Sequence, residues 1–129
     1  NSSLKDYSIL EKENRYQNLL EAVDRSNIGI LIVDTEHRIR MMNESLINAY
    51  GQQTGKICYE GIRKEKSKCK HCRLNDVIQD GKKVHYQFTD KNNRQLDIVA
   101  VPFKDIDGKI CKLEIIQDIT DRKHYEDAL

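Results

Sequence analysis

The chain has 129 residues, the size of one domain that buries a single hydrophobic core. Its 22 basic and 21 acidic residues nearly cancel, so its overall charge gives no reason to expect nucleic acid or an anionic membrane as a partner. The sequence holds no apolar run near the roughly 20 residues that span a bilayer, and it opens on no signal peptide. We therefore expect a domain of the reducing cytoplasm, where structural disulfides are disfavoured.

Residues 4–26 are predicted to form a helix, because apolar side chains recur there at three- and four-residue steps without Gly or Pro. We assign residues 1–26 to an N-terminal helix that serves as a linker. Such a stripe packs on its own domain or pairs with a second copy of the chain, and the length of this one allows both. Both ends of the sequence resemble cut helices, so we expect a module of a larger protein, with an effector domain in cis after residue 129.

Two strands and a helix are predicted next. The β-branched run 29–34 is typical of a buried central strand, and residues 38–43 form a second strand after a polar turn. Asn43 is placed to cap a helix over residues 44–50 that ends at Gly51.

The rest of the sequence predicts three more strands. Residues 52–73 are rich in lysine and irregular, and a short helix is expected over 74–79. The strands are expected at 84–88, 96–103 and 110–116, the last two joined by a tight turn at Asp107-Gly108. The order predicts an α+β fold with a five-stranded, mostly antiparallel sheet.

Four stretches resemble PAS sensor domains of bacterial and archaeal signal-transduction proteins. They are Asn27–Ile30, Arg40–Asn43, Asp107–Lys109 and Glu114–Lys123, and the last is similar to the Asp-Ile-Thr signature that precedes an output helix. The resemblance covers roughly residues 15–125.

The resemblance implies a PAS domain over residues 27–120 and the start of a C-terminal signalling helix over 121–129. It implies helices on one face of the sheet, often enclosing a pocket, flanking N- and C-terminal helices, and a homodimer formed through those terminal helices. Asp118 and Thr120 would then lie at a signalling hinge. Simple helix capping is the other interpretation of these two residues, and it is compatible with a hinge.

The four cysteines are the candidate metal ligands: Cys58, Cys69, Cys72 and Cys111. Cys69 and Cys72 have the Cys-x-x-Cys spacing with which two thiolates hold one metal ion. On the last strand Cys111 and Lys112 are adjacent, so their side chains point to opposite faces of the sheet. Because a charged side chain is more stable in water, we predict that Lys112 faces water and that Cys111 points toward the helices. All four sulfurs would then meet around zinc, or alternatively around an iron–sulfur cluster.

The lysine-rich segment supports a metal, since it has little apolar area of its own to order it. The cysteine pattern also resembles a cysteine-bearing subset of PAS domains. The alternatives are a dithiol switch of Cys69 and Cys72, inert thiols, and a metal held by three cysteines and His71.

Other cofactors are not expected. His85 should face outward on its strand, so we do not expect haem, and the Asn-Cys-Arg-Phe segment of flavin-binding PAS domains is absent from the sequence. His37 lies in a turn and His124 in the terminal helix, and neither indicates a site. No catalytic motif occurs, and an enzyme has in its favour only Cys58 or Cys72 with a nearby histidine.

The sequence thus predicts a non-enzymatic sensory module of a signalling protein, such as a histidine kinase of a two-component system or a cyclase. It would sense a ligand, a metal or a redox state through its pocket and cysteines, and relay the signal through its terminal helices. The alternative is a ligand-free PAS relay or dimerisation module with structural zinc or incidental cysteines.

Overall fold

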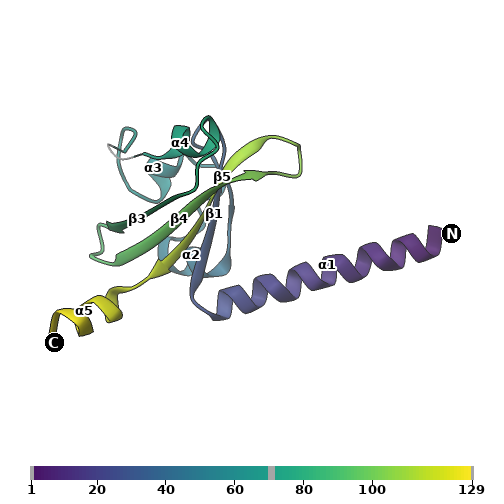
Figure 1. The fold of residues 1–129 in the computed structure, drawn as a ribbon, viewed down its shortest axis with the longest axis horizontal. Helices are drawn as coiled ribbons and strands as arrows, with labels where there is room; N and C mark the ends of the chain where they lie inside the picture. Colours follow the sequence, from purple (N-terminus) through teal and green to yellow (C-terminus); the bar gives the residue numbers. More distant parts are fainter. Residues whose placement is uncertain (1, 70–71, 129) are drawn as a thin grey trace.

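The computed structural model describes residues 2–69 and 72–128, which form an α+β domain around one antiparallel sheet (Figure 1). The elements are α1 (Ser2–Arg25), β1 (Ile28–Val33), β2 (Ile39–Met42), α2 (Glu44–Tyr50), α3 (Cys58–Gly61), α4 (Leu74–Ile78), β3 (Val84–Thr89), β4 (Gln95–Lys104), β5 (Ile110–Asp118) and α5 (Thr120–Ala128). Every predicted strand and helix is confirmed, and its observed ends lie within about two residues of the predicted ones. The short helix α3, inside the segment predicted as irregular, was missed.

The sheet has five strands in the order β2-β1-β5-β4-β3. All neighbouring pairs are antiparallel, as predicted. The hairpin between β4 and β5 turns at the predicted Asp107-Gly108, where the Gly108 φ of 83° suits a residue without a side chain. Because β5 is the middle strand and runs into α5, it joins the core of the domain directly to the C-terminal helix.

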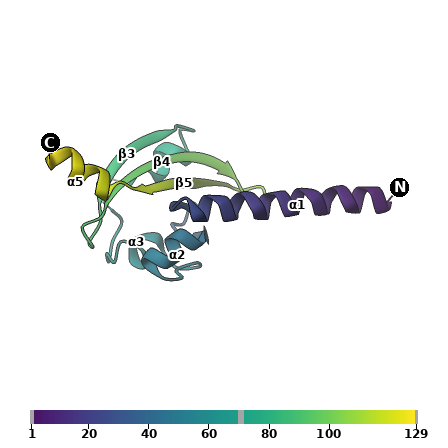
Figure 2. The same cartoon turned by 90° about the horizontal axis from the view of Figure 1, so that it is seen from below.

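One face of the sheet is covered by helices and carries the core (Figure 2). Side chains of the strands and of α2 and α4 interlock there. The fully packed members are Leu31, Val33, Ile39, Met42, Leu46, Leu74, Leu96, Ile98 and Ile116. Residues of β5 that share the parity of Ile116 therefore point toward the helices, and those of the other parity point away.

Asn43 fastens β1 to the start of α2. It occupies the predicted N-cap position, but its side chain makes no capping hydrogen bond. Instead its Oδ1 accepts a hydrogen bond from the Ile30 backbone N–H and its Nδ2 donates to the Ile28 carbonyl, each at 2.8 Å. The prediction of a side-chain cap is thus wrong, because the buried amide finds both of its partners on the neighbouring strand.

Helix α1 extends away from the sheet, and the two ends of the chain lie at opposite ends of the molecule (Figures 1 and 2). It contacts β1 and α2. Its large apolar side chains are mostly exposed: Leu4, Tyr7, Ile9, Leu10, Tyr16 and Leu19. Within the described part of the chain, no helix has both the length and the apolar character needed to cross a membrane.

Candidate functional site

Cys111 lies on the face of β5 that points away from the helices, so the predicted orientation is wrong. It is fully buried, but the charges around its thiol belong to Arg40, Asp34 and the β4–β5 turn. The residues of β5 that point toward the helices are Lys112, Glu114 and Ile116, which are between 3% and 8% exposed. The structure therefore does not bring Cys111 to the other three cysteines.

The prediction failed because Lys112 and Glu114 neutralise each other. Two residues apart on one strand, they share a face, and Lys112 Nζ lies 2.8 Å from Glu114 Oε1. Burial alone would raise the pKa of Glu114, but the charge and hydrogen bond of Lys112, together with Arg63 and Tyr86, outweigh burial and hold that pKa below its usual value. The Tyr86 hydroxyl donates a further hydrogen bond to Glu114 Oε1 at 3.3 Å.

The remaining cysteines form what we call the thiol cluster: Cys58, Cys69 and Cys72. Cys58 and Cys72 pack against the hydrophobic core, and all three thiols are partly buried. Burial raises the pKa of Cys58 to about 11, Lys112 opposes that rise, and charges on Glu114 and the other two thiols add to it. The cluster thus lies near enough to the buried Lys112–Glu114 pair of β5 for their charges to act on its thiols.

His37 adjoins the thiol cluster, a position for which we predicted no site. Its Nδ1 is 4.0 Å from Cys58 Sγ. The two residues are held together by the backbone, since the Cys58 N–H donates to the His37 carbonyl at 2.7 Å and Arg38 forms an isolated antiparallel bridge with Ile57. The imidazole also packs edge-on against the Tyr59 ring, with centroids 5.7 Å apart.

The protonation states of this pair do not suit nucleophilic catalysis. Burial lowers the pKa of His37, and the nearby charges of Lys68 and Lys112 lower it further. Because the Cys58 pKa is raised and the His37 pKa is lowered, both groups are neutral near pH 7. A nucleophilic cysteine needs the opposite arrangement, a thiolate beside an imidazolium. Neutral imidazole is, however, the form that ligates metals.

The described residues do not hold a preformed metal site. Nowhere in residues 2–69 and 72–128 do three or more His, Cys, Asp or Glu side chains approach closely enough to ligate one ion. The Cys72 N–H donates a hydrogen bond to the Cys69 carbonyl at 3.2 Å. The predicted alternative ligand His71 lies outside the described residues.

The two predicted hinge residues lie where β5 ends and α5 begins. The Asp118 carboxylate accepts hydrogen bonds from the Thr120 backbone N–H, at 2.9 Å, and from the Thr120 hydroxyl. The Thr120 hydroxyl oxygen accepts from the Gln95 N–H of β4 at 2.9 Å. The beginning of α5 is thereby fastened to two strands of the sheet.

The other predicted histidine positions agree with the structure. His85 faces outward with its side chain 60% exposed, and its Nε2 lies 2.8 Å from Asp97 Oδ1. His124 is exposed on α5.

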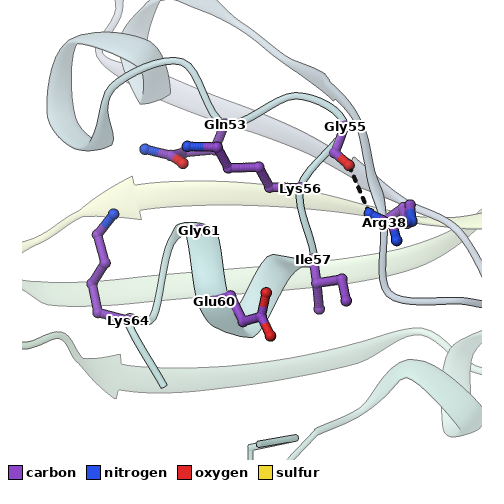
Figure 3. A pocket seen from close by; sticks show the side chains of 8 residues that line it. All are labelled: Arg38, Gln53, Gly55, Lys56, Ile57, Glu60, Gly61 and Lys64. Atoms are coloured by element: carbon purple, nitrogen blue, oxygen red, sulfur yellow. Dashed lines mark hydrogen bonds between the residues drawn. The ribbon is translucent and has the colours of Figure 1, made fainter. Parts of the chain in front are cut away.

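A hollow lies on the surface beside α3 (Figure 3). It has a volume of about 240 Å³ and a mixed charged rim that includes Arg38, Lys56, Lys64 and Glu60. Arg38 is tied across its edge to the Gly55 carbonyl at 3.0 Å. Since apolar side chains pack the helical face of the sheet, this open hollow is not the enclosed pocket that the resemblance implied.

Comparisons with known proteins agree on the fold. A domain of an HTR-like protein from Haloarcula marismortui matches with a TM-score of 0.63 at 15% identity, over 73% of this chain and 99% of that chain. The PAS domain of Bordetella pertussis BvgS matches with a TM-score of 0.63 at 16% identity, over 89% and 93% of the two chains. A sensory box sensor histidine kinase from Vibrio cholerae matches with a TM-score of 0.56 at 17% identity, over 86% and 93%.

These structures share an antiparallel α+β architecture with the chain described above. The chain has the PAS fold, as its sequence predicted. No family model matches the sequence, and no curated protein does.

Proposed function

We propose that this chain is the sensory module of a signalling protein such as a sensor histidine kinase, and that its signal is zinc bound by the thiol cluster. The supporting observation is the position of the thiol cluster against Lys112 and Glu114 of β5. A bound metal would turn protonated thiols into thiolates and change the charge that this buried pair experiences. The ammonium of Lys112 would then interact with thiolates as well as with Glu114.

The relay would run along β5 into α5. From Glu114 the strand continues to Asp118, whose carboxylate holds the first turn of α5 through Thr120. A ligand shifts such a two-state helix arrangement only by its difference in affinity for the two states, and a few kcal/mol is enough. Asp118 and Thr120 act in this proposal as the hinge that transmits the shift to an effector domain in cis.

We include a homodimer in the proposal because of α1. Three of its exposed apolar side chains, Ile9, Tyr16 and Leu19, share one face of the helix, which a second copy of the helix could cover. Sedimentation analysis of the chain should give a dimer that Ile9→Glu dissociates and that the control Asn14→Glu, on the opposite face of the helix, leaves intact. A monomer for the unaltered chain would remove this part of the proposal.

Zinc is favoured over a redox switch of Cys69 and Cys72 because Cys58 lies near enough for both to act on it, so a metal would use three thiols and a disulfide only two. Purified reduced chain should carry about one zinc per molecule, and the double variant Cys69→Ser/Cys72→Ser should carry none. Cys111→Ala is the matched control and should keep the metal. A brown protein that contains iron instead would indicate the iron–sulfur alternative.

The relay is tested by hydrogen exchange of the backbone amides of residues 118–123, among them the Lys123 N–H that donates to the Ile119 carbonyl at 2.9 Å. Zinc should change their exchange rates in the unaltered chain and not in the double variant. If zinc binds but these rates do not change, the metal is structural and the module is a relay without a metal signal. If no zinc binds, the cysteines are incidental.

A further inference from the structure

We propose that His37 supplies the fourth ligand of the zinc site, so that the thiol cluster holds the metal with three sulfurs and one imidazole nitrogen. This inference rests on the zinc binding proposed above and deepens it. His37 takes the place of the predicted ligand Cys111, which lies on the other face of the sheet.

The distance between His37 and Cys58 fits neighbouring ligands of one tetrahedral ion. With Zn–S about 2.3 Å and Zn–N about 2.0–2.1 Å, two ligand atoms at the tetrahedral angle lie about 3.6 Å apart. The observed separation of Nδ1 and Sγ is 4.0 Å. A movement of a few tenths of an ångström would therefore bring these two atoms to ligand spacing.

The backbone prearranges this half of the site. His37 has a φ of 65°, in the left-handed region that is uncommon for any residue other than glycine. That conformation closes the turn after Asp34, where the His37 N–H donates to the Asp34 carbonyl at 3.1 Å. The hydrogen bond from Cys58 to the His37 carbonyl then fixes the second ligand beside the first.

The other half of the site has to close onto this pair. Cys69 and Cys72 lie near enough to Cys58 for their charges to affect it, yet the described residues hold no preformed group of three ligands. Both cysteines belong to the polar segment between α3 and α4, whose sequence has Ile62 as its single aliphatic residue. Metal binding supplies the ordering energy that such a segment lacks.

The surrounding charge also favours three sulfurs and one neutral nitrogen. Zn²⁺ with three thiolates and an imidazole carries one net negative charge, whereas four thiolates carry two. Lys68 and Lys112 act electrostatically on His37 and Arg63 acts on Glu114, while Asp34 opposes the two lysines at His37. Glu114 is already neutralised by its own ion pair with Lys112, which leaves a modest positive surplus to balance the single charge.

The experiment is zinc and Co²⁺ titration of the reduced full chain against a competing chelator, with variants at His37. His37→Asn keeps a residue that tolerates positive φ but seldom binds zinc, and His37→Gly removes the side chain without backbone strain. His85→Asn and Cys111→Ala are the matched controls, and His71→Asn tests the other histidine. Thermal unfolding of each metal-free variant verifies that it folds.

Losing a residue that only orients a metal ligand weakens metal binding by about 10–100-fold, so losing a ligand should weaken it at least as much. We therefore expect both His37 variants to bind zinc more weakly by at least this factor. The control variants should bind zinc as tightly as the unaltered chain does. X-ray absorption of the zinc-loaded chain should show three sulfurs near about 2.3 Å and one nitrogen near about 2.0 Å. Unchanged affinity and Co²⁺ spectrum in both His37 variants would overturn the inference, as would loss of binding in Cys111→Ala or His71→Asn. Absence of zinc binding by the unaltered chain would instead overturn the proposed zinc signal itself.

Discussion

Replacing Lys112 with methionine should strongly destabilise the metal-free domain. The substitution leaves the Glu114 carboxylate buried without its partner, in a pair whose side chains are only 7% and 4% exposed. Breaking a buried ion pair in this way costs about 3–5 kcal/mol, out of a total stability of about 5–15 kcal/mol for a domain. The Tyr86 hydroxyl, at 3.3 Å, is too distant to replace the lost ammonium.

The measurement is urea unfolding with a chelator present, at pH 7 and at lower pH. In the unaltered chain Glu114 has a lowered pKa, so its stabilisation is present above its unfolded pKa and is lost as the pH falls through its folded pKa. In Lys112→Met the folded pKa should instead rise, so the difference between the two proteins should shrink toward acid pH. The melting temperature should fall by about 10–20 °C at neutral pH.

The double variant Lys112→Met/Glu114→Leu is the decisive control. Replacing both partners of a buried pair with apolar side chains is often neutral or stabilising by about 1–4 kcal/mol. We therefore expect the double variant to recover most of the loss. A single variant that loses less than about 1 kcal/mol at pH 7, or a double variant no better than the single, would refute the reasoning.

Three further changes test the frame around the site. Asn43→Ala should cost about 2–4 kcal/mol in urea unfolding, since it leaves two backbone groups of β1 unpaired; a loss of about 1 kcal/mol or less would fit an ordinary cap. Gly29→Ala places a Cβ against the Leu46 side chain and should cost about 1–3 kcal/mol by overpacking, a loss that Leu46→Ala should not worsen additively. Tyr50→Phe removes a 2.7 Å hydrogen bond to Asp90, whose pKa lies below its usual 3.8 because this bond and the Arg94 contacts outweigh burial. Its destabilisation should be full at pH 7 and fade below about pH 4; a pH-independent loss would contradict that role.

Strand positions were predictable because alternation and the Asp107-Gly108 turn are local signals. The orientation of β5 was not, since both parities offered plausible core residues. Lys112, Glu114 and Ile116 compete with Cys111, Leu113 and Ile115 for the helical face. The assumption that every charged side chain faces water fails here, because opposite charges two residues apart on a strand can be buried as a pair.

The contact of His37 with Cys58 could not be predicted from the sequence either. It depends on the isolated backbone bridge between Arg38 and Ile57, which brings together two side chains that are 21 positions apart. It further depends on α3, a helix of four residues in a segment with no apolar periodicity. Such short elements are set by tertiary contacts and not by propensity, so a sequence pattern has nothing periodic to detect.

The Lys112–Glu114 pair is better suited to coupling than to stability. An apolar pair at these positions could stabilise the fold as well. What the two charges add is an electrostatic interaction with the nearby thiol cluster. If the relay proposed above operates through these charges, Lys112→Met/Glu114→Leu should fold and bind zinc while losing the zinc-dependent change in exchange at residues 118–123. Should that change persist in the double variant, the signal must reach α5 through the packing of the helices on the sheet and not through the charges of β5.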